Sequence, residues 1–441
     1  MKKIAIEGFS FCEGGVCAAK GFKAGAMRCG IRKSHTKKDL AMILSDCVCN
    51  ASAVYTTNRV KASPILLTKE HLADGKAQAA AAMYTTNKVK GAPLTVTKEH
   101  LKNGMAQAII VNSVNANTCN ADGAEKAQEM CRLAAKELGL PEEDVLVAST
   151  GVIGQPLPIE PIADGIPALC KGISATGNTA AVEAIMTTDT MPKEVAVEFQ
   201  LGGTTCKLGG MLKGSGMIHP NMATTLTFLT TDAAVSQELL QRALRDVVRV
   251  TLNRVSVDGD TSTNDMVVVL ANGAAGNPCV NKENEAFETL KNALYAVLMN
   301  LARMMARDGE GATKLITCVC SGADQEETAA CIAKSVITSS LFKAAMFGED
   351  ANWGRILCAI GYADASFPMD AVSVDLASEF GRIHVCENGA GVDFSEETAK
   401  KVLAAEEIQV LISIGDGEGK AIAWGCDLTY NYVKINGDYR S

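Results

Sequence analysis

Amphipathic helices alternate with short apolar strands along this chain, and that alternation limits the fold more than any other feature. Three segments carry apolar side chains at helical spacing: residues 123–138, 236–255 and 285–306. Five runs resemble buried strands: residues 144–149, 265–271, 314–320, 371–375 and 408–415. Strands and helices must bury their apolar faces against one another. We therefore predict an α/β or α+β fold, with sheets covered by helices.

Length and charge exclude several classes of protein. The 441 residues suffice for two or three structural lobes, and the 47% hydrophobic and 21% charged content is typical of a globular protein. A net charge of −8 argues against a nucleic-acid surface. No apolar run approaches the roughly 20 residues that span a bilayer. The N-terminus lacks the pattern of a signal or transit peptide, so we expect a cytoplasmic protein.

The cysteines and histidines do not predict a metal or redox site. The 16 cysteines include no C-x-x-C pair, and without a signal peptide a disulfide framework is not expected. The pairs Cys47/Cys49 and Cys318/Cys320 lie in apolar runs, where both side chains of a strand face the same way. The five histidines form no spaced metal pair. We expect buried, reduced thiols and no metal.

One segment occurs twice. Residues 55–79 return as residues 84–108, beginning with Tyr-Thr-Thr-Asn in each copy, at an offset of 29 residues. A single tandem copy is not a solenoid, because stacked repeats need three or more units to bury a continuous core. We interpret it as a local duplication in which one copy is surplus, loops out or stacks beside the other, and could damage the protein.

Four turns rich in glycine or threonine stand where strands or helices end: residues 149–158, 185–193, 213–226 and 258–265. None matches a phosphate-binding loop, a dinucleotide fingerprint or a serine nucleophile elbow. A hydroxyl nucleophile without a histidine needs another base. A threonine supplies its own base if it becomes an N-terminus, since a free α-amine has a pKa of about 7.7–8.0.

The junction between Ala223 and Thr224 suits such a cleavage. The Thr224 hydroxyl can attack the Ala223 carbonyl, and hydrolysis of the resulting ester would expose Thr224 as an N-terminus. Alanine leaves the carbonyl uncrowded, and the preceding glycines allow a strained approach. Taken alone, a Thr-Thr pair entering a strand is also ordinary core material.

Ten motifs occur together and in order, and as a set they are specific: GGVCAAKGFKAGAM, SDCVCNASAVYTTNRVKASP, KAQ/MAQ followed by AIIVNSVNAN, STGVIGQPLP, IMTTDTMPK, KGSGMIHPNMATTL, DGDTSTND, RDGEGATK, GEDANWGRI and NGDYRS. With them the chain resembles the glutamate N-acetyltransferase / ornithine acetyltransferase family of arginine biosynthesis. The resemblance covers essentially the whole chain, apart from the extra repeat copy.

The resemblance implies a protein that cleaves itself before Thr224. Residues 1–223 become an alpha chain, which contains the repeat and the turn 149–158, and residues 224–441 become a beta chain. The implied activity moves an acetyl group from N-acetylornithine to glutamate through an acetyl-threonine. It needs no cofactor, although some members also accept acetyl-CoA. The implied fold is the ornithine acetyltransferase sandwich, and the implied assembly is a heterotetramer of two alpha and two beta chains.

The resemblance also assigns site residues. Thr224 is the nucleophile, Thr150 and Gly151 form the oxyanion hole, and a further set contacts substrate: Thr187, Lys213, Glu310, Asn436 and Ser441. Lys213 suits a substrate carboxylate, and Glu310 suits a substrate ammonium group. Thr188 lies next to Thr187, and the choice of Thr187 over Thr188 rests on the resemblance alone. His219 is interpreted as a turn residue.

Three features depart from the family pattern or leave alternatives open. Val114 stands where the family usually has glycine, and Thr225 offers a second hydroxyl beside Thr224. The duplication lies upstream of the predicted oxyanion strand. Two other functions therefore remain open: a related self-processing aminopeptidase or amidase, and an inactive variant disabled by the duplication.

Overall fold

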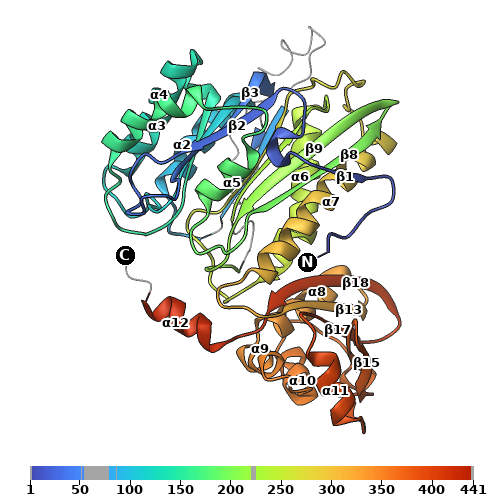
Figure 1. Ribbon diagram of the computed structural model, residues 1–441. Coiled ribbons are helices and arrows are strands. Elements are labelled where there is room, and N and C mark those ends of the chain that lie inside the picture. Colours follow the sequence, from blue (N-terminus) through green and yellow to red (C-terminus); the bar gives the residue numbers. More distant parts are fainter. Residues whose placement is uncertain (1, 51, 54–78, 86, 220–224, 439–441) are drawn as a thin grey trace.

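The computed structural model describes residues 2–50, 52–53, 79–85, 87–219 and 225–438. Two sheets lie one above the other in Figure 1, each packed against helices. The predicted α/β sandwich with helical layers is confirmed.

The first sheet has the strand order β1-β8-β9-β10-β12-β3-β6-β7, and β2 also pairs with β3. Its strands are β1 (Ser10–Cys12), β2 (Phe22–Met27), β3 (Leu40–Asn50), β6 (Met105–Asn112), β7 (Val145–Ser149), β8 (Lys193–Leu201), β9 (Thr204–Lys213), β10 (Leu226–Thr231) and β12 (Met266–Ala271). A separate pair joins β4 (Ser52–Ala53) to β5 (Ala79–Tyr84).

The second sheet has the order β11-β18-β13-β17-β14-β15-β16. Its strands are β11 (Val255–Ser256), β13 (Leu315–Gly322), β14 (Ser373–Ser378), β15 (Gly381–Glu387), β16 (Ala390–Gly391), β17 (Glu407–Ser413) and β18 (Gly417–Cys426). In β13, Cys318 and Cys320 are both fully buried, as the same-face prediction requires.

Helices cover both sheets. They are α2 (Ala92–His100), α3 (Gly123–Leu138), α4 (Ile159–Lys171), α5 (Asn178–Ile185), α6 (Gln237–Val250), α7 (Glu285–Arg307), α8 (Glu326–Thr338), α9 (Ser340–Phe347), α10 (Trp353–Gly361), α11 (Glu396–Leu403) and α12 (Tyr430–Asp438). Short 3-10 turns are η1 (Gly15–Cys17), η3 (Leu101–Asn103), η4 (Glu142–Asp144), η5 (Leu252–Arg254) and η6 (Met369–Ala371).

The alternation of side chains along the strands explains these layers. In β10, Leu226 and Phe228 pack on the face that carries α5, whereas Leu229 packs on the face that carries α6 and α7. The opposite end of the sheet packs on α3 and α4. Burying both faces needs near-continuous apolar strands, which is what the sequence runs contain.

One predicted helix is too long. The helix expected over residues 236–255 begins after Ser236, whose Oγ accepts a hydrogen bond from the Leu239 amide, but α6 ends at Val250. The Thr251 hydroxyl donates to the Val247 carbonyl, and the Thr251 backbone leaves the helical region. The following residues form η5 and β11 instead.

The register at the centre of the first sheet brings three strand ends together. Leu226 of β10 pairs with Lys213 of the antiparallel β9 and with Met266 of the parallel β12. The end of β9 and the starts of β10 and β12 therefore share one edge of the sheet, where loops carry the predicted chemistry.

The second repeat copy is built into this fold. It continues from Tyr84, at the end of β5, through α2 and into β6. Most of the first copy lies outside the described residues, and so does the predicted loop-out. Across the described ranges no single helix is long and apolar enough to cross a membrane, and α8 with α9 meets that test only as a pair bent by 59°.

Candidate active site

A pocket lies at the edge where β9 ends and β10 and β12 begin. It holds about 250 Å³ not filled by atoms, part of it open to solvent. Its lining comes from four separate segments: Thr150, Lys213, Gly214, Gly216, Met217, Ile218, Thr225, Leu226, Ser262, Asn264 and Asp265. Three of the four turns picked out in the sequence meet here, although they are up to 115 residues apart in the chain.

The predicted nucleophile itself lies outside the described residues, as do Ala223 and Ser441. Thr225 lines the pocket, and its carbonyl accepts a hydrogen bond of 2.7 Å from the Met266 amide. Thr225 is thus anchored beside Thr150 and Lys213.

The turn after β7 is held in a strained conformation. Gly151 has a φ of +129°, and a Cβ there would lie 2.1 Å from the carbonyl carbon of Val114. Val114 itself has a φ of 81°, a region that a β-branched residue enters at a cost of about 1–3 kcal/mol. Val114, which stands where the family usually has glycine, is therefore strained directly against the predicted oxyanion turn.

Asn264 fastens this turn to the start of β12. Its Nδ2 donates to the carbonyls of Ala116 at 2.6 Å and Ser149 at 3.0 Å. Its Oδ1 accepts from the hydroxyls of Thr118 at 2.7 Å and Thr263 at 2.6 Å. All four hydrogen-bonding positions of a buried amide are used, so the side chain is a rigid brace rather than a free ligand.

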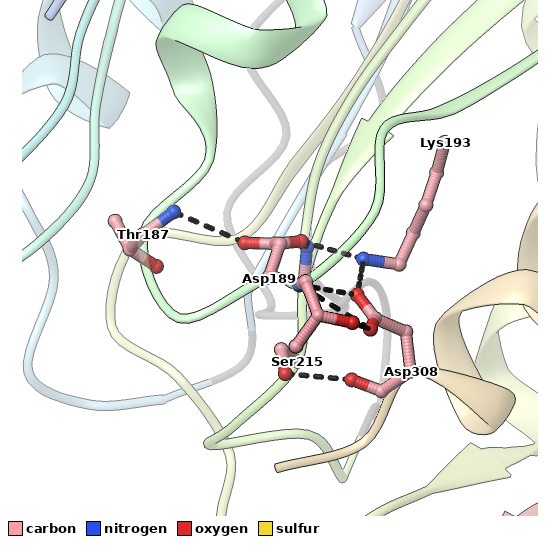
Figure 2. A network of polar contacts seen from close by, with 7 residues as sticks. Thr187, Asp189, Lys193, Ser215 and Asp308 are labelled. Atoms are coloured by element: carbon pink, nitrogen blue, oxygen red, sulfur yellow. Dashed lines mark hydrogen bonds and ion pairs between the residues drawn. The ribbon is translucent and has the colours of Figure 1, made fainter. Parts of the chain in front are cut away.

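A buried cluster of three charges lies next to the pocket (Figure 2). The Lys193 ammonium, fully buried, contacts the carboxylates of Asp189 at 2.7 Å and Asp308 at 2.5 Å. Burial acts to raise the pKa of Asp189, but Lys193, Lys213 and hydrogen bonds overcome it and lower that pKa to about 2. Asp189 is therefore ionised beside the Lys193 ammonium.

This cluster positions three of the predicted substrate-binding segments. Asp189 accepts hydrogen bonds from the amides of Thr187 at 3.1 Å and Gly214 at 2.8 Å, which fixes the residue after Lys213. Ser215 donates through its hydroxyl to the Asp308 carbonyl at 2.7 Å and accepts the Glu310 amide at 3.0 Å.

Glu310 lies behind the pocket wall. A Cβ on Gly216 would come within 2.3 Å of the Glu310 carboxyl group, so the absence of a side chain at Gly216 makes room for it. Asn436 of α12 donates to Glu310 Oε2 at 2.8 Å. The C-terminal helix thus docks onto the loop after α7, as expected for a tail that reaches the site.

The structure brings together most, but not all, of the predicted site residues. Thr150 and Lys213 line the pocket, while Glu310 and Asn436 lie just behind it. Thr187 is not part of the pocket lining, and only its amide is tied to the site. Nothing in the described contacts separates Thr187 from Thr188 as a substrate ligand.

Lys213 is the positively charged residue of the described pocket lining. Among the described residues, no carboxylate lies within ion-pairing distance of the Lys213 ammonium, which is half-buried. Burial and Lys334 lower the pKa of His219 to about 4, and its ring contacts the Ser256 hydroxyl outside the pocket lining. His219 is a neutral turn residue, and Lys213 supplies the positive charge.

Sequence reasoning missed five residues here: Asp189, Lys193, Asn264, Asp265 and Asp308. Each lies in or beside a motif that had been selected for its threonines and glycines. The signal available was the presence of charged and amide side chains directly next to buried strands, where such groups need partners.

The central cluster yields a stability prediction. Lys193→Met leaves Asp189 and Asp308 buried without their cation, and we expect it to lower the free energy of unfolding by about 3–5 kcal/mol at pH 7. Because the folded pKa of Asp189 is depressed, its contribution is present above the unfolded value near pH 4 and is lost as pH falls toward 2.

Denaturant unfolding from pH 7 to pH 3 measures both effects. Lys23→Met is the matched control, because its pair with Asp46 is about half-exposed and should cost under about 1 kcal/mol. Equal losses for the two variants would contradict the role given to Lys193.

Asn264 also distinguishes the two repeat copies. Gly91 of the second copy lies against it, and a Cβ at that position would be 2.5 Å from Asn264 Nδ2. The corresponding residue of the first copy is Ala62. The second copy therefore fits beside the Asn264 side chain, whereas Ala62 of the first copy would displace that side chain.

Two deletions of 29 residues test this difference. Removing residues 55–83 leaves the second copy and should keep or raise stability and activity. Removing residues 80–108 leaves the first copy with Ala62, and the clash should lower the melting temperature by at least about 3 °C, since displaced buried amides cost about 1–3 kcal/mol.

Adding Ala62→Gly to the second deletion should restore the lost stability. Melting curves of the two deletion variants and of the second deletion with Ala62→Gly test these expectations. If the chain that lacks residues 55–83 is insoluble while the full-length chain is active, both copies are integrated into the fold.

The family comparisons agree with this geometry. The ArgJ family model matches residues 23–80 and 73–441, two segments that meet inside the repeat, as expected for a chain with one surplus copy. The arginine biosynthesis bifunctional protein ArgJ of Caldanaerobacter subterraneus is 46% identical over 430 residues, covering 97% of this chain and 99% of its own. That of Bacillus subtilis is 42% identical, covering 97% of each chain.

Two solved structures are also similar. The arginine biosynthesis bifunctional protein ArgJ of Bacillus halodurans is 42% identical, with a TM-score of 0.46, over 48% of this chain and 98% of its own. An ornithine acetyltransferase of Mycobacterium tuberculosis, solved with ornithine, is 28% identical, with a TM-score of 0.38, over 49% of this chain and 100% of its own. On the family match and the near full-length identity to its relatives, this chain belongs to the ArgJ family of arginine biosynthesis bifunctional proteins.

Proposed function

We propose that this protein transfers the acetyl group of N2-acetyl-L-ornithine to L-glutamate, with Thr224 carrying the acetyl group between them. One observation carries the proposal: in a chain of the ArgJ family, Thr150 of the predicted oxyanion turn, Lys213 and Thr225, the residue after the predicted nucleophile, line one pocket. This set combines a donor turn, a cation and an adjacent hydroxyl, which acyl transfer between amino acids requires.

Each residue has a physical task in this reaction. The Thr150 hydroxyl and the Gly151 amide stabilise the oxyanion that forms at the acetyl carbon, as preorganised donors do. Lys213 binds the α-carboxylate of the substrate and Glu310 its ammonium group. The resemblance adds Thr187, Asn436 and Ser441 as further substrate contacts, and the hydrogen bond from Asn436 to Glu310 supports the placing of the tail near the substrate.

The base is the α-amine that cleavage creates on Thr224. No histidine lines the pocket among the described residues, and His219 is neutral at physiological pH. An α-amine with a pKa of about 7.7–8.0 is free to accept the hydroxyl proton near neutral pH. The proton then passes to the ornithine nitrogen as the bond to the acetyl carbon breaks.

The sheet supports a stable association of the two cleaved chains. β10 and β12 belong to residues 224–441, yet they lie between β9 and β3 of residues 1–223. Separating the halves would expose both edges of these buried strands. We propose that the halves remain together, in a cytoplasmic heterotetramer of two alpha and two beta chains.

No cofactor is proposed, and acetyl-CoA is a candidate second donor. Supplying either acetylornithine or acetyl-CoA as the sole donor, and measuring acetylglutamate, tests both activities. Release of free acetate without acetylglutamate would instead favour the hydrolase alternative.

Cleavage at Thr224 is directly testable. The chain should split into residues 1–223 and 224–441, which co-purify and appear as two bands on a denaturing gel. Thr224→Ala should stay as one chain and lose acetyl transfer, whereas Thr224→Ser should still cleave because it keeps a hydroxyl.

Thr225→Ala is the matched control and should cleave nearly normally. N-terminal sequencing of the second fragment identifies the nucleophile. A fragment that starts at Thr225, or an intact wild-type chain with full activity, would contradict the proposed mechanism.

The oxyanion turn gives a second kinetic prediction. Thr150→Ala should slow acetyl transfer by about 10²-fold or more, because it removes one preorganised donor. Steady-state rates and a melting curve separate catalysis from folding, since Thr150→Ser keeps the hydroxyl and should retain much of the rate. An unchanged rate in the alanine variant would mean that this turn has only a structural role.

A further inference from the structure

Met217 is an apolar residue of the pocket lining whose side chain stays accessible. Three of the described lining residues have large apolar side chains: Met217, Ile218 and Leu226. Ile218 and Leu226 pack into the hydrophobic cores on either side of the first sheet and are each only 2% exposed, whereas Met217 is 42% exposed. Ligand pockets combine apolar walls with a few polar groups, so an accessible apolar side chain there points to contact with the apolar part of a ligand.

The backbone at Met217 is held in a conformation that residues other than glycine rarely adopt. Its φ is 58°, in the left-handed region. The Asp258 carboxyl group accepts the Met217 amide at 2.7 Å through Oδ2 and the Ile218 amide at 2.9 Å through Oδ1. The Ile218 carbonyl accepts the Val257 amide at 2.8 Å. These hydrogen bonds fix the position of Met217 despite the strain, and such fixed, strained residues cluster at sites that contact ligands.

Met217 is near both charged groups to which the proposed function assigns the ends of the substrate. It lines the same pocket as Lys213, which is assigned the substrate carboxylate. It also follows Gly216, where a Cβ would lie 2.3 Å from the carboxyl group of Glu310, which is assigned the substrate ammonium group. An amino acid held at these two ends has its methylene chain in the pocket, and charged partners give that chain no apolar contact.

We propose that the Met217 side chain packs against the methylene chain of the amino-acid substrate and so determines the chain length that the pocket accepts. This inference rests on the proposed function, in which one pocket takes acetylornithine and glutamate, whose side chains differ by one methylene group. The methionine side chain is unbranched and flexible, and it adapts to apolar surfaces of different shape. It can therefore contact both chains, while Lys213 and Glu310 recognise the charged ends.

Met217→Gly removes the side chain and keeps the backbone, because glycine favours a positive φ and Asp258 still accepts the amide. We expect this variant to melt no lower than wild type. Its kcat/KM for acetylornithine and for glutamate should fall at least about fivefold through lost apolar contact. Its kcat should stay within about twofold, since a contact made equally in the bound substrate and in the transition state affects KM alone. Steady-state formation of acetylglutamate measures both quantities.

Substrate length is the readout that a merely structural role would not change. Replacing acetylornithine by acetyldiaminobutyrate, a donor with one methylene group fewer, should cost wild type about threefold more in kcat/KM than it costs Met217→Gly, because only wild type has the contact to lose. Met217→Leu keeps an apolar side chain and should stay within about threefold of wild type. Met369→Ala is the matched control, since Met369 is also 42% exposed but begins η6, and it should change neither quantity.

Two results overturn this inference while leaving the proposed function intact. The first is a wild-type kcat/KM for both substrates in Met217→Gly, and the second is a lower kcat/KM with the same penalty for the shorter donor as in wild type. If Met217→Gly does not fold, the same measurements on Met217→Ala decide. A wild-type protein that forms no acetylglutamate from acetylornithine overturns both proposals.

Discussion

The contact of Lys193 with Asp189 and Asp308 is the interaction on which the site depends. It joins the start of β8, the loop before it and the end of α7 within one buried cluster. From the cluster, hydrogen bonds extend to the Thr187 amide, to Gly214 beside Lys213 and to Thr190. Three charges in a dry interior keep a fixed arrangement, because any displacement would leave a charge unpaired.

A second constraint is the strained turn at Gly151 and Val114. Its backbone has little freedom, since a side chain at Gly151 would collide with the Val114 carbonyl. The Asn264 amide holds the same turn through four hydrogen bonds to other segments. The strain therefore coincides with a turn whose position is fixed from several sides, a combination common where donors must be preorganised.

The two halves of the chain are interleaved rather than adjacent. β9 and β10 flank the junction at residues 223 and 224 and pair antiparallel along their length, while β12 lies between β10 and β3. The proposed cut between residues 223 and 224 lies outside the paired residues of β9 and β10, so it removes none of their pairings. The pairing of β9 with β10 is therefore compatible with the proposed cleavage before Thr224.

The sequence by itself determined the family and the bounds of some of the elements. Apolar periodicity gave α3 its observed bounds, because that helix ends at Gly139, which has a φ of 70°. It also gave α7 to within one residue, and the order of the motifs led to Thr150, Lys213, Glu310 and Asn436. These features are local, or are recorded in motifs that can be read along the chain.

Only the tertiary structure decided which polar side chains act together. Lys193 and Asp308 are 115 residues apart, and Asn264 reaches Ser149 over the same separation. Asp265 is an ordinary acidic residue in the sequence, and its burial beside Lys213 and Thr225 raises the pKa of its carboxyl group. Such partnerships depend on strand order and register, which bring distant strand ends to one edge, and no local pattern encodes that arrangement.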